Sequence, residues 1–147
     1  FFTEAGETIN RVHALDGHGI KLLQRGGSTP AGVTGRDSAP LRKRLAALGV
    51  THVRYGTEDK RPAAESILAD LGLTWSQAAA MGDDWPDAPV LRRVALACAP
   101  RSAHAEVWGL AHYVPDAAAG HGAVRSVCVL LLVASGQYER LWREQSA

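Results

Sequence analysis

Short apolar runs and helix-like segments alternate along most of this chain, and polar or glycine-rich residues follow the apolar runs. We expect strands at 29–34, 49–56, 78–81, 94–99 and 112–114. We expect helices at 20–24, 37–48, 57–71, 86–94, 103–111, 127–134 and 138–144. This alternation is typical of an α/β fold, in which helices cover both faces of a parallel sheet. The carboxyl ends of parallel strands share one edge, where such folds bind ligands.

The most acidic of these strand ends is the segment 82–87, with the sequence GDDWPD. Its carboxylates belong to Asp83, Asp84 and Asp87, and they directly follow an apolar run. Carboxylates are hard oxygen ligands, and Mg²⁺ takes one or two of them together with water and a phosphate oxygen. An acidic loop that only caps a helix is the alternative, because Asp is common and stabilising near a helix N-terminus.

Two further strand ends carry groups suited to an anion. The strand at 29–34 ends in TGR, where the Thr34 hydroxyl and the free N–H groups of a helix start can donate to phosphate. A simple helix cap by Thr34 or Asp37 is the alternative. Lys60 stands in the first turn of the next helix, where a cation opposes the helix dipole. A local rule broken at such a junction indicates function, although an exposed lysine is equally compatible with the sequence.

Three glycine-containing segments are less specific. The sequence DGHG at 16–19 predicts a compact loop whose backbone can approach a ligand, or else a helix cap with glycine for turn geometry. Residues 1–14 predict a β-hairpin around a polar turn at 4–7. The GHG turn at 120–122 is compatible with a ligand loop or with a plain connector.

The chain of 147 residues is long enough for one domain with a hydrophobic core, so we expect a single domain over 1–147. The net charge of +1 gives no general reason to expect nucleic-acid binding. No apolar run reaches the ~18 residues of a membrane span, and the first residues do not resemble a signal peptide. Cys98 and Cys128 lie in apolar runs without a CxxC spacing, so we expect two buried reduced thiols in a cytoplasmic protein.

Taken together, VTGR at 33–36, Lys60 and GDDWPD at 82–87 resemble the second, third and fourth motifs of the haloacid dehalogenase superfamily. The hairpin, DGHGIK at 16–21 and GHGAVR at 120–125 are similar to its cap-less branch, the 3-deoxy-D-manno-octulosonate 8-phosphate phosphatases of lipopolysaccharide synthesis. This resemblance covers essentially the whole chain. It implies a Rossmann-like parallel sheet with a β-hairpin in place of a cap domain.

The same resemblance implies a Mg²⁺-dependent enzyme that hydrolyses a small sugar-acid phosphate to the free sugar acid and phosphate. It also implies a homotetramer, in which the hairpin packs against neighbouring subunits. A neighbouring subunit and the C-terminal tail are expected to help close the cap-less site.

The resemblance also assigns roles to single residues. Asp83 is expected to be a direct Mg²⁺ ligand, with Asp84 or Asp87 holding metal-bound water or Lys60. Thr34 is expected to donate a hydrogen bond to the transferred phosphoryl group, and Lys60 to neutralise the phosphate and the nucleophile. The groups expected to face the sugar acid or its phosphate are Lys60, Arg36, Arg44, Lys21 and the loop 13–17, with Asp16 and Gly17.

Two departures from the family pattern stand out. The first motif, Asp-x-Asp-Gly-x-x-Thr at the end of a strand, is absent, and with it the nucleophile and the general acid/base. We expect it immediately before Phe1 in the complete protein, and we expect a chain starting at Phe1 to lack the central strand, to fold poorly and to be inactive. The second departure is His121, where the family usually has Arg, which would make a substrate contact there pH-dependent or remove it.

Two alternative functions remain open from the sequence. One is a catalytically inert tetramerisation module, since the same fold is attached to some nonulosonate cytidylyltransferases. Those domains tend to lose the TGR and GDD signatures that this chain keeps. The other is a phosphatase for a different nonulosonate phosphate, because the residues that reach the sugar come partly from another subunit.

Overall fold

The computed structural model describes residues 2–4, 6–7 and 11–147. Strand β1 (Phe2–Thr3) pairs antiparallel with β2 (Gly6–Glu7), so a hairpin is present, but its second strand lies within the segment 4–7 that was predicted as the turn. The predicted second arm falls partly on residues 9 and 10, which lie outside the described residues, and residues 11–13 are not in a strand.

Two pairs of short parallel strands follow. Strand β3 (Ala31–Val33) pairs with β4 (His52–Arg54), and β5 (Ala79–Met81) pairs with β6 (Leu96–Cys98). The predicted strand at 112–114 is reduced to one parallel bridge between Tyr113 and Cys98. The strand positions predicted from the sequence are therefore confirmed, although each strand is shorter than expected.

The two parallel pairs do not join into one sheet within the described part of the chain. Strands β3 and β5 each begin with an exposed residue and stay half-buried, whereas the last two residues of β6 are fully buried. The expected continuous sheet is therefore interrupted, because no described strand bridges the two pairs.

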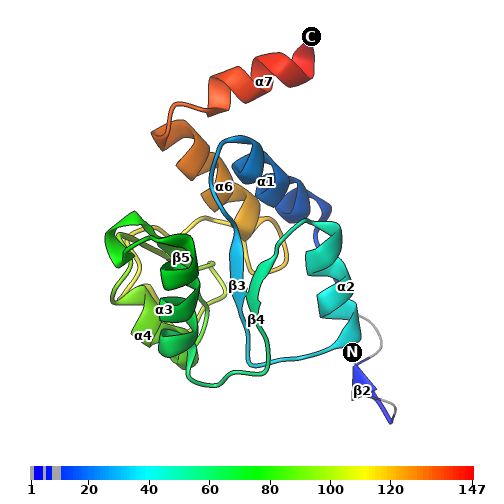
Figure 1. Ribbon diagram of the computed structural model, residues 1–147, viewed down its shortest axis with the longest axis vertical. Coiled ribbons are helices and arrows are strands. Elements are labelled where there is room, and N and C mark those ends of the chain that lie inside the picture. Colours follow the sequence, from blue (N-terminus) through cyan, green and yellow to red (C-terminus); the bar gives the residue numbers. More distant parts are fainter. Residues whose placement is uncertain (1, 5, 8–10) are drawn as a thin grey trace.

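Helices surround these strand pairs (Figure 1). The longer helices are α1 (Ala14–Arg25), α2 (Ala39–Ala47), α3 (Lys60–Leu71), α6 (Ala123–Ala134) and α7 (Tyr138–Ser146). The shorter ones are α4 (Ala88–Leu91), α5 (Ala105–Trp108) and the 3₁₀ turns η1 (Trp75–Gln77) and η2 (Trp85–Asp87). None of the described helices combines the length and the apolarity that a membrane crossing requires.

The hydrophobic core consists of two clusters of buried side chains. One cluster joins α4, β6 and α5, and its members are Leu91, Val94, Ala97, Ala99, Ala103 and Val107. The other joins α1, α6 and α7, and its members are Leu22, Leu23, Cys128, Leu132 and Leu141. Both cysteines are buried and unpaired, as predicted, and burial raises the pKa of each thiol to about 11.

The DGHG segment is neither the loop nor the helix cap that its glycines suggested, because it lies inside α1. Gly19 is buried, and a Cβ there would lie 3.1 Å from the Cβ of Cys128 on α6. A Cβ at Gly17 would overlap the guanidinium of Arg44 on α2. These glycines therefore allow α1 to approach its neighbours closely, and tertiary packing overrides their poor helix propensity.

Asp16 caps a helix that is distant in the sequence. Its carboxylate accepts hydrogen bonds from the backbone N–H of Gly122 at 3.3 Å and of Arg125 at 2.9 Å, at the N-terminus of α6. Its side chain is only 13% exposed. A carboxylate in this position satisfies free N–H groups and complements the helix dipole. Asp16 therefore holds α1 and α6 together.

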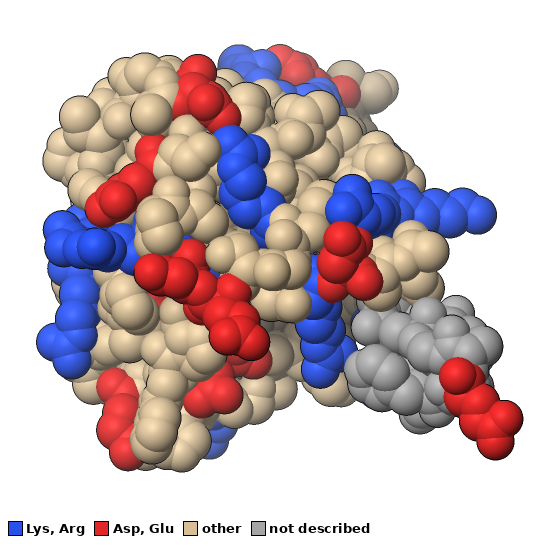
Figure 2. Space-filling model, turned by 60° about the horizontal axis from the view of Figure 1, so that its bottom comes forward, with Lys and Arg blue, Asp and Glu red and all other residues tan. Residues whose placement is uncertain are grey.

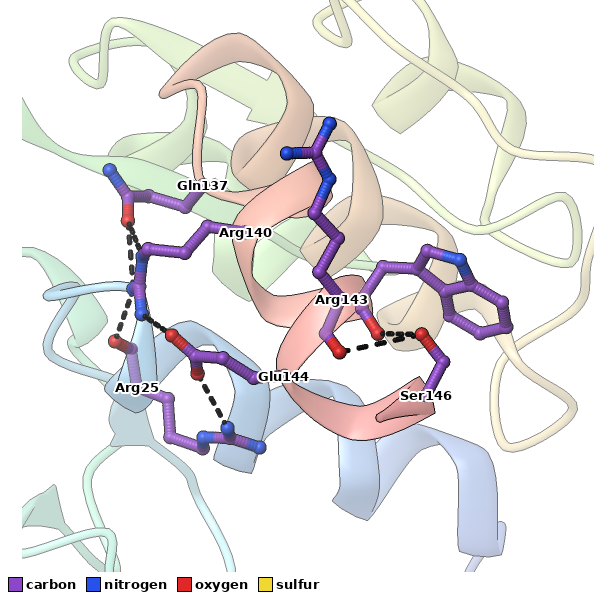
Figure 3. Close-up of polar contacts among 7 residues, drawn as sticks. Arg25, Gln137, Arg140, Arg143, Glu144 and Ser146 are labelled. Carbon is purple, nitrogen blue, oxygen red and sulfur yellow. Dashed lines mark hydrogen bonds and ion pairs between the residues drawn. The ribbon is translucent and has the colours of Figure 1, made fainter.

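The C-terminal helix α7 docks on the end of α1 (Figure 3). Glu144 forms ion pairs with Arg25 at 2.9 Å and with Arg140 at 2.7 Å, and Arg140 also donates to the backbone carbonyl of Arg25. Exposed ion pairs of this kind contribute little, so the buried Leu141 supplies most of the attachment. Figure 1 places α7 at the end of the molecule opposite the carboxyl ends of β3 and β4, so it does not cover the site of its own chain.

We predict that Asp16→Ala lowers the free energy of unfolding by about 1–2 kcal/mol, because it leaves N–H groups of α6 without an acceptor. Asp16→Asn, which keeps an acceptor oxygen, is expected to lose much less. Urea unfolding followed by circular dichroism measures both, with the exposed Asp116→Ala as the matched control. Equal stability of Asp16→Ala and wild type would show that the cap contributes nothing.

Candidate active site

The segments that follow β3 and β4 are tied to each other at one end of the molecule. The backbone N–H of Thr34 donates to the carbonyl of Arg54, and the N–H of Thr57 donates to the carbonyl of Thr34, at 3.0 and 3.1 Å. Figure 1 shows this end at the bottom, and Figure 2 brings it forward. Acidic side chains gather near the middle of that face, with Lys and Arg side chains around them.

The TGR turn after β3 is fixed by several contacts. The hydroxyl oxygen of Thr34 accepts the backbone N–H of Arg36 at 3.0 Å, so Thr34 orders its own turn. Thr34 does not cap α2, whose N-cap is Ser38. No described group accepts the O–H of Thr34, which leaves this hydrogen available to a ligand.

A bidentate ion pair supports the same turn from outside. Asp37 accepts from Arg42 at 2.6 and 2.8 Å, and this hydrogen bonding lowers the pKa of Asp37. The guanidinium of Arg42 also lies 4.0 Å from the ring centroid of Tyr55. These contacts link the turn to α2 and to the segment after β4, so Thr34 is held from both sides.

Asp87 is the hub of the acidic segment. One of its oxygens lies 2.6 Å from Nζ of Lys60, and the other accepts the backbone N–H groups of Asp83 at 2.9 Å and Asp84 at 3.3 Å. The side chains of Lys60 and Asp87 are only 19% and 14% exposed. Of the two carboxylates expected to hold Lys60 or metal-bound water, Asp87 is therefore the one that contacts Lys60.

The other two carboxylates differ in what they contact. An oxygen of Asp84 accepts the N–H of Trp85 at 2.8 Å and caps η2, so the capping explanation holds for Asp84. The carboxylate of Asp83 is exposed and has no hydrogen bond or ion pair with any described residue. Asp83 is therefore the side chain that is left available for a cation.

These residues fit Mg²⁺ as a site with few protein ligands. Among residues 2–4, 6–7 and 11–147, no three His, Cys, Asp or Glu side chains gather closely enough to hold a metal ion by themselves. Mg²⁺ keeps several waters and uses one or two carboxylates together with substrate phosphate. Asp83, with the capping residue Asp84 next to it, supplies hard oxygen donors of this kind.

The remaining predicted residues lie on α1 and α2 or in the tail. Lys21 lines an open hollow of about 610 Å³ between α1 and the end of α2, and Arg44 lies against Gly17. The ring of His121 contacts the carbonyl of Ala119 at 2.9 Å. None of Asp16, Gly17, Lys21, Arg44 and His121 hydrogen-bonds or ion-pairs with Lys60 or the acidic segment.

The loop after β6 also contacts the acidic segment, although no sequence motif predicted it. The backbone N–H of His104 donates to the carbonyl of Asp83 at 2.9 Å, and its ring packs edge-on against Trp85 with centroids 5.7 Å apart. His104 also pairs with Glu106. A hydrogen bond from its own backbone N–H, and next the charge of His104, lower the pKa of Glu106. The one sequence signal that could have indicated this loop as part of the site is its position directly after a predicted strand.

The chain is similar to known phosphatases in sequence and in structure. No family model matches the chain. The 3-deoxy-D-manno-octulosonate 8-phosphate phosphatase KdsC of Yersinia pestis is 39% identical over 134 residues, which are 91% of this chain and 72% of that protein. A probable YrbI-family phosphatase from Pseudomonas syringae has a TM-score of 0.96 and 39% identity, covering 100% of this chain and 84% of that one.

A third similar protein carries ligands. The 3-deoxy-D-manno-octulosonate 8-phosphate phosphatase of Moraxella catarrhalis was solved with a magnesium ion, a phosphate ion and a KDO molecule. Its TM-score is 0.94 at 28% identity, covering 98% of this chain and 83% of that one.

The fold and the site together identify the class of protein. A Rossmann-like α/β fold with charged groups at the strand ends is the fold of the haloacid dehalogenase superfamily of hydrolases, and the structural neighbours belong to the same class. Within this class the chain belongs to the 3-deoxy-D-manno-octulosonate 8-phosphate phosphatase family, because it is 39% identical to a member over most of both chains.

Position 82 requires glycine, because the side chain of Asp87 lies directly against its Cα. A Cβ there would lie 2.6 Å from Cγ of Asp87, much closer than a normal contact. We predict that Gly82→Ala destabilises the protein by roughly 1–3 kcal/mol, because the carboxylate that holds Lys60 must move.

Gly109→Ala is the matched control for this variant. Gly109 has a φ of −62°, and the nearest atom to a Cβ there is at an ordinary 3.4 Å. Urea unfolding of both variants tests the prediction. Equal stability of Gly82→Ala and Gly109→Ala would contradict it.

Proposed function

We propose that this chain belongs to a Mg²⁺-dependent phosphomonoester hydrolase that converts 3-deoxy-D-manno-octulosonate 8-phosphate to the free sugar acid and phosphate in lipopolysaccharide biosynthesis. One observation carries the proposal beyond family membership. Asp87 pairs with Lys60 and also accepts the backbone N–H of Asp83. Asp83 is thereby fixed at the strand end, while its own carboxylate contacts no other described residue. A cation, a hydroxyl and an uncommitted carboxylate together suit phosphoryl transfer by electrostatic stabilisation.

Each residue has a distinct task in this proposal. Lys60 neutralises charge on the phosphate, and its ion pair with Asp87 keeps the ammonium in place. Thr34 donates its hydroxyl hydrogen to a phosphoryl oxygen. Asp83, with Asp84 beside it, would hold Mg²⁺, and the ion would supply positive charge for the transferring phosphoryl group. Arg36, the last residue of the TGR turn, has the task of facing the sugar-acid phosphate.

The proposal also covers the residues that lie apart from this cluster. Lys21 and Arg44 supply positive charge toward the substrate from α1 and α2. Asp16 and Gly17 act through the packing of α1, which sets where Lys21 and the GHG turn at 120–122 lie. The family's nucleophile and general acid/base belong to a motif that this sequence does not contain, so this chain's own part in the reaction is charge stabilisation and positioning.

We further propose that the enzyme is a homotetramer in the cytoplasm. The family resemblance and the hairpin support the tetramer, and the two unpaired buried cysteines suit a reducing compartment. Light scattering coupled to size-exclusion chromatography tests the assembly. A monomer at micromolar concentration would contradict it.

We predict that Asp83→Ala, made in the protein expressed from its whole gene, lowers Mg²⁺-dependent turnover by roughly 10²–10³-fold or more. Its free energy of unfolding is expected to change by less than about 0.5 kcal/mol, because the side chain is exposed and contacts no polar group in the part of the chain that the structure describes. Phosphate release and urea unfolding measure the two effects. Near-wild-type activity would show that Asp83 is not a metal ligand.

Asp116→Ala is the matched control. Asp116 is exposed, and its ion pair with Arg101 is long, at 3.6 Å.

A panel of nonulosonate phosphates, assayed with the wild-type protein, distinguishes the proposed phosphatase from the two alternative functions. A preference for a nine-carbon substrate would identify a neighbouring phosphatase. Release from no sugar phosphate would favour the inert assembly module.

A further inference from the structure

The backbone of Asp83 is held from two sides. On one side its N–H donates to the carboxylate of Asp87, which also pairs with Lys60. On the other side its carbonyl accepts the N–H of His104 at 2.9 Å, at the start of α5. The first contact lies within the acidic segment, whereas the second comes from the loop after β6. The position of Asp83 therefore also depends on what holds that loop.

Glu106 connects this loop to the acidic segment through side chains. Its carboxylate pairs with Nδ1 of His104, and it accepts a hydrogen bond from the indole N–H of Trp85. The rings of Trp85 and His104 pack edge-on, with centroids 5.7 Å apart. A hydrogen bond from its own backbone N–H lowers the pKa of Glu106 most, and contacts with His104 and Trp85 lower it further. The three side chains thus form one cluster across η2 and α5.

This cluster adjoins the candidate metal ligands without joining them. The backbone N–H of Trp85 donates to Asp84 at 2.8 Å, and Asp84 is the neighbour of Asp83 in the chain. Glu106 belongs to no group of three His, Cys, Asp or Glu side chains that could hold a metal ion, among residues 2–4, 6–7 and 11–147. Its effect on a cation at Asp83 would therefore pass through the residues that it holds.

We propose that Glu106 is a positioning residue of the metal site: by holding Trp85 and His104 together, it keeps Asp83 in place at the end of β5 to receive the cation. This inference rests on the proposed function, and it adds how the exposed carboxylate of Asp83 is positioned. The side chains of His104 and Glu106 are 52% and 63% exposed, and exposed ion pairs contribute little to global stability. Removing Glu106 is therefore expected to weaken metal binding without unfolding the protein.

The test measures the binding of Mn²⁺, as a probe of the Mg²⁺ site, to substrate-free protein expressed from its whole gene. Electron paramagnetic resonance of the unbound ion gives its Kd, and Mg²⁺ is added as a competitor. For Glu106→Ala the Kd of both ions is expected to rise roughly three- to tenfold, because a group that orients a metal ligand is lost. The turnover that this variant loses at low Mg²⁺ is expected to return at high Mg²⁺.

Two further variants separate position from charge. Glu106→Gln keeps an oxygen that accepts from His104 and Trp85, so its Kd is expected to stay within about twofold of wild type. Trp85→Phe keeps the ring and removes the N–H that Glu106 accepts, so its Kd is expected to rise. A Glu106→Gln variant that binds as weakly as Glu106→Ala, or an unchanged Kd in Trp85→Phe, would overturn the inference. Trp85→Phe decides the test even where thermal unfolding shows that Glu106→Ala does not fold.

Glu139→Ala is the matched control. Glu139 also lies in the first turn of a helix and pairs with an exposed cation, Arg143 on α7. Its Kd is expected to equal the wild-type value, and an equal Kd in Glu106→Ala would overturn the inference. A wild-type protein that shows the expected dependence on Glu106 but releases phosphate from no sugar phosphate would instead overturn the proposed function and leave the inference standing.

Discussion

The ion pair between Lys60 and Asp87 is the interaction on which the site depends. It joins the first turn of α3 to the segment after β5, across 2.6 Å and with little solvent exposure. A lysine at a helix N-terminus opposes the dipole, and the Asp87 carboxylate offsets this cost. Removing one partner would leave a charge in a mostly buried position without compensation. The pair therefore fixes both the cation and the loop that faces it.

One consequence is a division of work among three adjacent carboxylates. Asp87 uses both oxygens to hold Lys60 and the backbone of its neighbours, and Asp84 caps η2. These structural tasks leave the carboxylate of Asp83 exposed and uncommitted at the strand end. The helix-cap explanation of GDDWPD is thus confirmed for Asp84, while Asp83 stays the predicted metal ligand of the same segment.

The sequence predicted the strand positions, the parallel pairing and the junctions at Thr34, Lys60 and Asp83, because these depend on local patterns. It left DGHG open between a loop and a helix cap, whereas the segment lies inside α1, since glycine signals a turn and close packing equally well. The deciding contacts of Gly19 and Asp16 come from α6, more than 100 residues along the chain. Long-range packing of this kind leaves no mark on a local pattern.

The loop after β6 was not predicted, for the same reason. Phosphate chemistry needs charged residues at fixed spacing, so it leaves motifs in the sequence, whereas this loop is fixed through ordinary groups. The backbone N–H of His104 donates to the carbonyl of Asp83, and the hydroxyl oxygen of Ser102 accepts the N–H of Ala119. Groups of this kind are common in any sequence, and only the fold places His104 beside Asp83. The acidic segment is therefore readable from its motif, while the loop that packs against it requires the folded chain.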